Sequence, residues 1–307
     1  MSSKKIVVVG IFVVDLSFSS EKLPSQGETI IGNDYAIGPG GKGSNQAVAI
    51  SRSGGKASLI ARIGDDQFGR TGIKLYESEK VYTEGLIIAK GEKTGAAAIS
   101  VDKHGMNSII VVPGASKGLT PKMVESNVEL LKSSSSVLTG FEIPLETLCY
   151  TIKLGKSLGL KTILNPAPFS KIDKQIYKLV DYLTPNEHEA SSLTGVKVTD
   201  LVSAQEAGKK ICELGVGVSI ITLGEKGVLC TRGKTDDGIY LPAIKLSEKV
   251  IDTVGAGDVF NGAFATAINE GRDLEKSLTF ANKAASISVR NKGAALSAPY
   301  RKEINNL

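Results

Sequence analysis

The chain has 307 residues, of which 41% are hydrophobic and 22% charged, and its formal net charge is +5. This length fits one large α/β unit with an appendage or two modest domains, and this composition excludes a disordered or fibrous chain. The small positive charge forms no basic stripe, which argues against nucleic acid as a partner. Three dispersed cysteines and two histidines exclude a disulfide framework and a histidine-rich metal cluster, and they indicate a reducing compartment.

The first expected element is a strand. Lys4-Lys5 and the apolar run of residues 6–14 resemble a short signal peptide. The run is β-branched, however, and Asp15 follows it without a small-residue cleavage pattern, which favours a buried strand. No stretch approaches the roughly 20 apolar residues of a membrane span. We therefore expect a cytoplasmic protein that does not contact a membrane.

Short β-rich runs alternate with helical patterns along most of the chain. The expected strands are Ile6–Val9, Ala57–Ile63, Ser136–Thr139, Lys161–Asn165, Asp181–Thr184 and Ser219–Leu223. The expected helices are Asn45–Arg52, Pro121–Leu131, Leu145–Leu158 and Ala204–Leu214. Strands that are apolar throughout and separated by helices are typical of a Rossmann-like, mostly parallel sheet covered on both faces. Without repeats or a low-complexity linker, residues 1–307 are expected to form a single α/β domain.

Two segments, about 12–37 and 94–112, lack strong helical periodicity. In the second, the polar turn Asp102-Lys-His-Gly105 separates two strand-like halves, which is a hairpin signal. Two such insertions predict a small β-sheet lid beside the core. Ordinary edge hairpins are the alternative.

The turn Gly38-Pro-Gly-Gly-Lys-Gly43 matches the G-x-G-x-x-G pattern. That pattern belongs directly after the first core strand, whereas the first expected strand ends at Gly10. An NAD-dependent oxidoreductase therefore has only a misplaced motif in its favour. Glycines allow close approach of the backbone to a ligand, and Ser44-Asn45 would open a helix with free N–H groups. This arrangement predicts a polyol site, and a plain tight turn capped by Ser44 is the alternative.

Near the C-terminal end, Gly255-Ala-Gly257 opens an amphipathic run and exposes backbone N–H groups at a positive helix end. Asp258 would repel an anion held there unless both act on one reacting atom, and phosphoryl transfer supplies that reason. A helix-start aspartate is the alternative. Asp252, just before the turn, is either a cation ligand or a capping or turn residue.

Two further turns follow expected strands. In the segment 184–190, Asn186, Glu187 and Glu189 offer oxygens suited to hydrated Mg²⁺, although glutamates in a first helical turn are also ordinary. The glycine-containing segment 222–227 ends a strand where a nucleotide could dock, and by itself it is a weak signal.

Together these stretches resemble the PfkB family of carbohydrate kinases, and within it the ribokinases, over essentially the whole chain. The resemblance rests on the order and spacing of eight stretches, namely Leu23–Thr29, Gly40–Asn45, Gly64–Asp66, Asn165–Pro168, Thr184–Glu187, Ile221–Gly224, Asp252–Asp258 and Lys292–Ala294. It implies a ribokinase-like fold with a β-sheet lid, ATP as phosphoryl donor and a sugar, D-ribose first, as acceptor.

The resemblance also implies roles for particular residues. Asp258 would be the catalytic base, with Gly255, Ala256 and Gly257 as the anion hole. The sugar would be bound by Asp15, Gly40, Gly41, Lys42, Asn45, Glu142 and Asp258. The nucleotide would be bound by Asn186, Thr222, Gly224, Gly227, Gly257 and Asn282. A monovalent cation, K⁺, would be bound by Asp252, Val254, Ser288, Asn291, Gly293 and Ser297, while Glu187 and Glu189 would be linked to Mg²⁺. Related lids pair across a homodimer.

One position departs from the pattern of the resemblance. Bacterial ribokinases often carry Asn two residues before the lid aspartate, where this chain has Val13. Losing a buried amide removes a hydrogen bond that discriminates between hydroxyl patterns. The departure predicts altered acceptor choice, with 2-deoxyribose as the first competitor. Another sugar, a sugar phosphate or a nucleoside is the wider alternative, and a non-catalytic sugar- or nucleotide-binding protein is the alternative of a different class.

Overall fold

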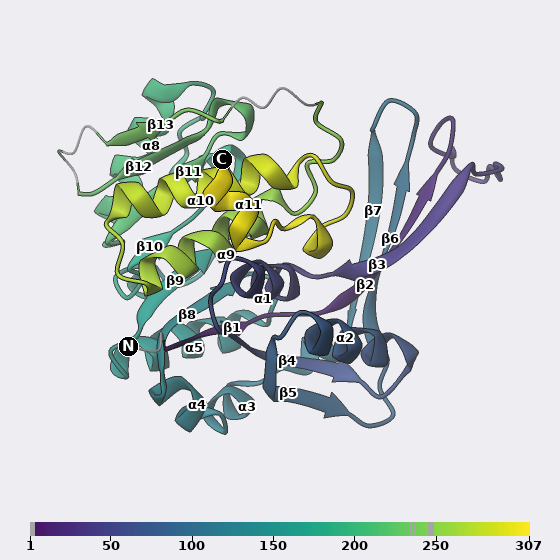
Figure 1. Cartoon of the computed structure of the whole chain (residues 1–307), viewed down its shortest axis with the longest axis horizontal. Coiled ribbons are helices and arrows are strands. Elements are labelled where there is room, and N and C mark those ends of the chain that lie inside the picture. The colour runs from purple at the N-terminus through teal and green to yellow at the C-terminus, as the bar shows by residue number, and fades with distance from the viewer. Residues whose placement is uncertain (1–3, 234, 236–237, 245–248) are drawn as a thin grey trace.

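The computed structural model describes residues 4–233, 235, 238–244 and 249–307. In this part of the chain a large sheet is flanked by helices, and a small sheet projects from it (Figure 1). The strands are β1 (Lys5–Val9), β2 (Val13–Ser19), β3 (Asp34–Gly40), β4 (Ala57–Gly64), β5 (Tyr82–Ala89), β6 (Thr94–Val101), β7 (Asn107–Gly114), β8 (Ser134–Gly140), β9 (Lys161–Asn165), β10 (Tyr182–Leu183), β11 (Val218–Thr222), β12 (Val228–Thr231) and β13 (Ile239–Leu241). The helices are α1 (Lys42–Arg52), α2 (Gln67–Ser78), α3 (Pro121–Glu125), α4 (Val128–Lys132), α5 (Leu145–Ser157), α6 (Lys174–Tyr177), α7 (Glu187–Thr194), α8 (Leu201–Glu213), α9 (Ala256–Asn269), α10 (Leu274–Ser288) and α11 (Arg301–Asn306).

The large sheet has the order β13-β12-β11-β10-β9-β8-β1-β4-β5. Its strands pair in parallel from β11 to β5, and β12 and β13 add an antiparallel edge. Successive side chains of β1 belong to different cores: Val7 and Val9 are part of the core that also includes residues of α3, α5 and α8, and Ile6 and Val8 are part of the core that includes residues of α1 and α2. Because helices cover both faces, the four residues of β1 that follow Lys5 are all apolar and buried. The expected mostly parallel α/β fold is confirmed.

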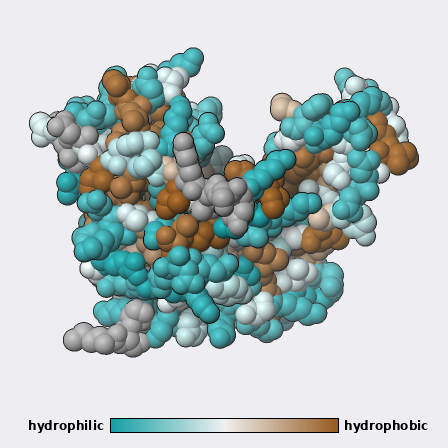
Figure 2. Space-filling model, turned by 45° about the horizontal axis from the view of Figure 1, so that its top comes forward, coloured by the Kyte–Doolittle hydropathy of each residue, from teal (hydrophilic) through white to brown (hydrophobic). Residues whose placement is uncertain are grey.

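The small sheet has the order β3-β2-β6-β7 and is built from the two segments that lack helical periodicity. Its central strands β2 and β6 pair in parallel, and β3 and β7 pair antiparallel at its edges. Its base packs on α2 through Val14 and Leu16, which point away from the face that carries Asp15. Figure 2 shows the molecule hollowed between the body and this projecting sheet.

Several element boundaries differ from the expectations. Helix α1 begins at Lys42, with Gly41 as its N-cap, rather than at Ser44-Asn45. The cause is tertiary, because the carboxylate of Glu142 accepts the N–H of Lys42 at 2.7 Å and replaces the local cap. The expected helix Pro121–Leu131 is two short helices, α3 and α4, with a break between them. The expected strand Asp181–Thr184 shortens to β10.

Within the described ranges, no helix combines the length and the apolar character that crossing a membrane requires.

Candidate active site

The candidate site lies where the parallel strands of the large sheet end at their carboxyl termini. Asn165 ends β9, Thr222 ends β11, and Glu142 follows β8 by two residues. In parallel α/β sheets this edge is the usual place for ligands, because helix N-termini and loop side chains converge there. The small sheet rises from the same edge through Val13, which follows β1. The motifs that the sequence scatters over more than 200 residues therefore meet along one edge.

Asp258 lies in the first turn of α9, behind an N-cap at Gly255 whose φ of 78° is in the left-handed region. Its side chain is buried, and only 4% of the residue is exposed. Its Oδ2 accepts a hydrogen bond from Nδ2 of Asn45 at 2.9 Å, and its Oδ1 accepts one from Nε2 of Gln46 at 3.0 Å. The two donors fix the carboxylate in one orientation and leave further lone pairs on both oxygens.

The close packing of α1 against α9 brings these donors to Asp258. Gly262 is the point of closest approach, since a Cβ there would lie 2.5 Å from Cβ of Ala49 and 2.8 Å from the carbonyl oxygen of Gln46. Only glycine allows this separation between the helices. A residue in the middle of α9 thus determines how near the carboxylate comes to its partners.

The start of α9 presents backbone donors to the same space. Gly257 and Asp258 belong to the first turn, whose N–H groups have no intrahelical acceptor. The N–H of Ala256 differs, because it donates to the carbonyl oxygen of Thr253 at 3.3 Å. Of the predicted anion-hole donors, the N–H of Gly257 therefore remains available at the helix end, whereas the N–H of Ala256 is already hydrogen-bonded within a turn.

Four charged side chains form the polar centre of the site, namely those of Asp15, Lys42, Glu142 and Asp258. Burial and the charge of Asp258 raise the pKa of Asp15 to about 6. Burial raises the pKa of Glu142 to about 7, against the opposing charge of Lys42. The carboxylate of Asp258 in turn raises the pKa of Lys42. Three carboxyl groups around one ammonium group offer acceptors and a donor to a polyhydroxylated ligand.

Gly40 and Asn45 complete this polar centre. A Cβ on Gly40 would lie 2.1 Å from Oδ1 of Asp15, so that the carboxylate lies directly over the backbone of β3. Oδ1 of Asn45 is buried and has no hydrogen-bond partner among the described residues. A buried acceptor without a donor is costly unless a ligand supplies one. The residues predicted to bind a sugar therefore lie together, and one of them lacks a donor.

The residues predicted to bind a nucleotide also converge. Asn186 bridges to Thr222 between the ends of neighbouring strands. Gly227, with φ 108°, passes so close to the segment after β13 that a Cβ would lie 2.1 Å from the carbonyl oxygen of Leu241. Asn282 of α10 donates to the carbonyl oxygen of Pro242 in that segment at 2.8 Å. Gly224 opens the intervening turn of residues 224–226. The set forms one continuous surface beside α9.

The acidic segment after β10 is arranged as a helix cap. Asn186 caps α7, its Oδ1 accepting the N–H of Glu189 at 2.8 Å, while the Glu189 carboxylate accepts the N–H of Asn186 at 2.9 Å. Burial raises the pKa of Glu189, and Glu187 is partly exposed beside it. The described residues contain no cluster of three or more acidic, histidine or cysteine ligands.

Asp252 ties two loops together. Its Oδ1 accepts the N–H of Val254 at 2.9 Å and its Oδ2 accepts the N–H of Gly293 at 3.0 Å. The N–H of Asp252 itself donates to the carbonyl oxygen of Val289 at 3.1 Å. The predicted cation ligands of residues 252–254 and 288–297 are thus neighbours. The hydrogen bonds of Asp252 are those of a turn aspartate, because the N-cap of α9 is Gly255, and they leave lone pairs free for a cation.

The site also includes four buried polar residues whose role was not predicted from the sequence. Gln46 donates to Oδ1 of Asn165 at 3.3 Å as well as to Asp258, and Asn165 donates to the carbonyl oxygen of Thr184 at 2.9 Å. Thr184 donates to Oδ1 of Asn261 at 2.6 Å, and Asn261 donates to the carbonyl oxygen of Gly257 at 2.8 Å. The available signal was a run of polar residues, Ser44-Asn-Gln46, at the start of an otherwise apolar helix.

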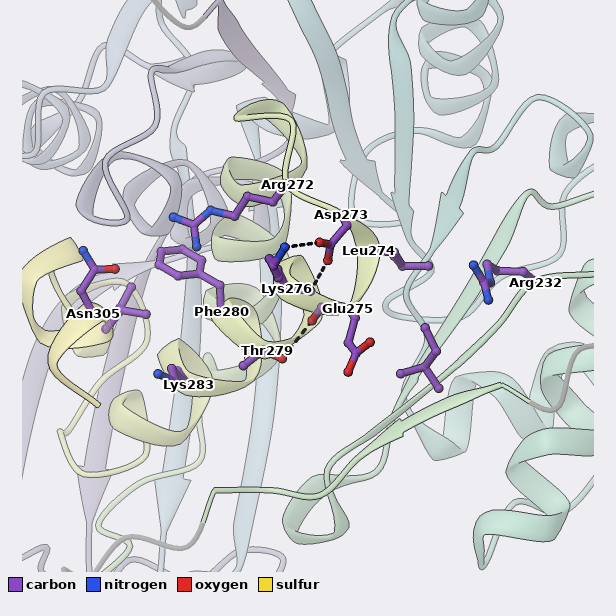
Figure 3. A pocket seen from close by; sticks show the side chains of 12 residues that line it. Arg232, Arg272, Asp273, Leu274, Glu275, Lys276, Thr279, Phe280, Lys283 and Asn305 are labelled. Carbon is purple, nitrogen blue, oxygen red and sulfur yellow. Dashed lines mark hydrogen bonds and ion pairs between the residues drawn. The ribbon is translucent and has the colours of Figure 1, made fainter.

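A separate surface pocket of about 780 Å³ lies between α10, α11 and the β12–β13 edge (Figure 3). None of the candidate site residues lines it. Its charges pair locally, with Nζ of Lys276 2.6 Å from Oδ2 of Asp273 and Nε of Arg272 3.0 Å from Oε2 of Glu270. The predicted chemistry therefore belongs to the cleft beside the small sheet, and not to this pocket.

Comparison with known proteins agrees with this site. Residues 3–301 match the pfkB family carbohydrate kinase model. A ribokinase from Haemophilus influenzae is 38% identical over 98% of this chain and 97% of its own length. A deoxyribokinase from Salmonella typhimurium is 34% identical over 98% of this chain and 97% of its own length. A bifunctional ribokinase/ribose-5-phosphate isomerase A from Fructilactobacillus sanfranciscensis is 36% identical over 99% of this chain, which spans 56% of it.

Among solved structures, an Arabidopsis thaliana ribokinase complexed with ribose and ATP superposes with a TM-score of 0.92. It is 32% identical, and the match covers 99% of this chain and 98% of that one. The chain belongs to the pfkB family of carbohydrate kinases, and the family resemblance drawn from its motifs is confirmed. It is a phosphotransferase with a carbohydrate as the acceptor.

Proposed function

We propose that this protein transfers the γ-phosphoryl group of MgATP to the primary 5-hydroxyl of D-ribose, giving ribose 5-phosphate. The observation that carries the proposal is the buried Asp258 carboxylate at the N-terminal turn of α9, oriented by Asn45 and Gln46. The ribokinases among the relatives, and the one complexed with ribose and ATP, support the choice of substrates.

Each part of the site has a role in this proposal. Asp258 is the general base that accepts the proton of the attacking hydroxyl. The amides of Gly255, Ala256 and Gly257 stabilise charge on the transferring phosphoryl oxygens, with Ala256 giving up its long bond to Thr253. The sugar hydroxyls bind Asp15, Lys42, Asn45 and Glu142 and the backbone at Gly40 and Gly41. A hydroxyl donating to Oδ1 of Asn45 would satisfy that buried acceptor.

The nucleotide would lie along the neighbouring surface. Asn186, Thr222, Gly224, Gly227, Gly257 and Asn282 are the residues assigned to it. At Gly224 a Cβ would meet nothing within 4 Å, so the backbone is open there, whereas Gly227 lies against the carbonyl oxygen of Leu241. Glu187 and Glu189 would contact the water shell of the Mg²⁺ that arrives with ATP, since the structure shows their segment as a cap rather than a closed cage. Mg²⁺ neutralises phosphate charge when bound.

A monovalent cation, K⁺, fits the loops joined by Asp252. Val254, Ser288, Asn291, Gly293 and Ser297 would complete its oxygen shell, and the cation would stiffen the turn before α9. Thermal unfolding of the protein in KCl and in LiCl at equal ionic strength tests the site without relying on turnover. We expect the parent protein to have a higher Tm in KCl than in LiCl. This difference should disappear in Asp252→Asn. Equal Tm values in both salts for the parent protein would contradict the K⁺ site.

We further propose that residues 1–307 form one domain whose small sheet acts as a lid, and that two lids pair in a cytoplasmic homodimer. Apolar side chains on the sheet that are more than half exposed support the pairing, namely Tyr35, Ile37, Ile109, Ile110, Val111 and Val112; brown atoms mark such apolar surface in Figure 2. Exposed patches of this kind are typical of interaction sites. Light scattering tests it: Ile110→Glu should convert a dimer into a monomer, and a monomeric parent protein would refute it.

The acceptor is tested by ADP release with MgATP and K⁺ on ribose, 2-deoxyribose, fructose 6-phosphate and adenosine. Val13 supports 2-deoxyribose as the second candidate, because it lies buried on the face of β2 that carries Asp15 and offers no hydrogen bond to a 2-hydroxyl. A preference for ribose by several orders of magnitude in kcat/KM would exclude that candidate. Sugar binding without turnover on any of the four would favour the non-catalytic alternative.

A further inference from the structure

The buried hydrogen bonds around Asp258 form a closed ring. The ring starts at Oδ1 of Asp258, passes through Gln46, Asn165, Thr184 and Asn261, and ends at the carbonyl oxygen of Gly257. Gly257 and Asp258 are consecutive, so the ring leaves α9 from a side chain and returns to the adjacent peptide group. It connects four separate elements, because Gln46 is on α1, Asn165 ends β9 and Thr184 follows β10.

All members of the ring are buried. Their exposed fractions are 2% for Gln46, 7% for Asn165, 2% for Thr184, 1% for Asn261 and 4% for Asp258. In such surroundings a hydrogen bond is strong and an unmatched group is costly, so the bonds of a network support one another. The direction of the bonds is determined by chemistry, because the carboxylate of Asp258 only accepts and Gln46 must present its NH₂ group to it.

The amide nitrogen of Gln46 therefore serves two acceptors. One hydrogen points to Asp258 and the other to Asn165, whose own amide is held by the carbonyl oxygen of Thr184. If Asn165 or Thr184 moves, Gln46 loses one anchor and the orientation of the carboxylate loosens. A misplacement of about 1 Å at a reacting group costs up to about 10²-fold in rate.

We infer that Gln46, Asn165, Thr184 and Asn261 are positioning residues that hold the Asp258 carboxylate in its reactive orientation. The inference rests on the proposed role of Asp258 as the base. It assigns to Thr184, which lies behind the reacting groups, an effect on kcat that is transmitted through Asn261 and Asn165. The ring also joins the base to the strand end that precedes Asn186, so the nucleotide side and the base side of the site share one support.

Thr184→Val tests the ring, because it removes the hydroxyl while keeping the side-chain volume. We expect kcat to fall about 10-fold, with KM for sugar and for ATP within twofold of the parent values. Thr184→Ser keeps the hydroxyl and should restore most of kcat. Thr266→Val is the matched control: Thr266 is also buried on α9 and bonds the carbonyl oxygen of Gly262, outside the ring. This control should lower Tm and leave kcat unchanged.

A double-mutant cycle shows whether the ring acts as a unit. Gln46→Met should lower kcat about as much as Thr184→Val or more, and the double variant should lose no more than the larger single loss. Parent kcat in both single variants, or losses that multiply in the double variant, would overturn the inference. Should Thr184→Val not fold, Gln46→Met is compared with Thr266→Val instead. Gln46→Met should then lower kcat with KM unchanged, and Thr266→Val should leave kcat unchanged. A failed kinase assignment is distinguishable, because the parent protein would then release no sugar-dependent ADP.

Discussion

The cleft has two walls that are built differently. The core wall carries Asn45, Gln46 and Asp258, each 4% exposed or less, and their side chains are joined by short hydrogen bonds. The wall on the small sheet carries Asp15, which is partly exposed and surrounded by β strands that project away from the body (Figure 1). The core wall rests on the large sheet and two packed helices, whereas the other wall packs on α2 through Val14 and Leu16 and joins the core at its base through Val13 and Ala97.

In the proposed function this difference separates chemistry from recognition. A general base must be held within a fraction of an ångström, which requires rigid elements and a supporting shell of hydrogen bonds. A wall that closes over a substrate needs to move, and segments with few buried contacts are the ones that open at low cost. Substitutions on the core wall should therefore lower kcat, and substitutions on the small sheet should raise KM.

The largest effect is expected for Asp258→Asn. The amide keeps the size and can still bond neighbouring groups, but it cannot accept the proton, so kcat should fall by about 10²–10⁴. The affinity for ATP, measured by calorimetry, should stay within a few-fold of the parent value. Turnover above a tenth of the parent rate would remove Asp258 as the base and with it the division between the two walls.

A smaller effect, on a different constant, is expected for Asp15→Asn. The substitution replaces a charged acceptor of sugar hydroxyls by a neutral one, which should raise KM for the sugar about 10-fold to 10²-fold. Since the reacting atoms lie on the other wall, kcat should change less than about fivefold, and KM for ATP should not change. Initial-rate measurements over both substrates check this. A loss in kcat as large as that of Asp258→Asn would show that the walls do not divide the work.

Much of the fold followed from local patterns. The apolar runs of β1, β4, β9 and β11 predicted buried parallel strands, because a strand covered on both faces has no polar side. The turn at Asp102–Gly105 predicted the β6–β7 hairpin, and the glycines before Asp258 predicted a helix end. In each case the residues that specify the structure are adjacent in the chain, so periodicity and turn chemistry are sufficient to find it.

The features that were not predicted depend on contacts between distant residues. Helix α1 starts three residues earlier than Asn45 because Glu142, a hundred positions away, accepts the N–H of Lys42. The ring through Gln46, Thr184 and Asn261 is invisible locally, since each residue is an ordinary polar side chain on its own element. The family motifs included Asn165 and Thr184, but only the structure shows which atoms they bond.

The subtlest expected effect concerns Glu142, which joins the start of α1 to the strand end after β8. Its folded-state pKa of about 7 lies above the ordinary glutamate value of 4.5. A raised carboxyl pKa contributes stability that is fully present below the unfolded pKa and is lost as the pH rises through the folded pKa. Between about pH 4.5 and 7 the contribution of this carboxyl group to the stability of the protein therefore falls as the pH rises. The side chain introduced by Glu142→Gln cannot ionise, so this variant should not lose stability in this way.

The difference in Tm between Glu142→Gln and the parent protein should accordingly move in favour of the variant from pH 5 to pH 8, by about 3 °C if the contribution is about 2 kcal/mol. Asp15 titrates in both proteins, and Lys42, whose pKa is raised, stays protonated in both, so the comparison isolates Glu142. Glu146→Gln, an exposed glutamate four residues further on, is the control and should show no such trend. A pH-independent difference would mean that Glu142 is charged throughout, and that the bond to Lys42 outweighs its burial.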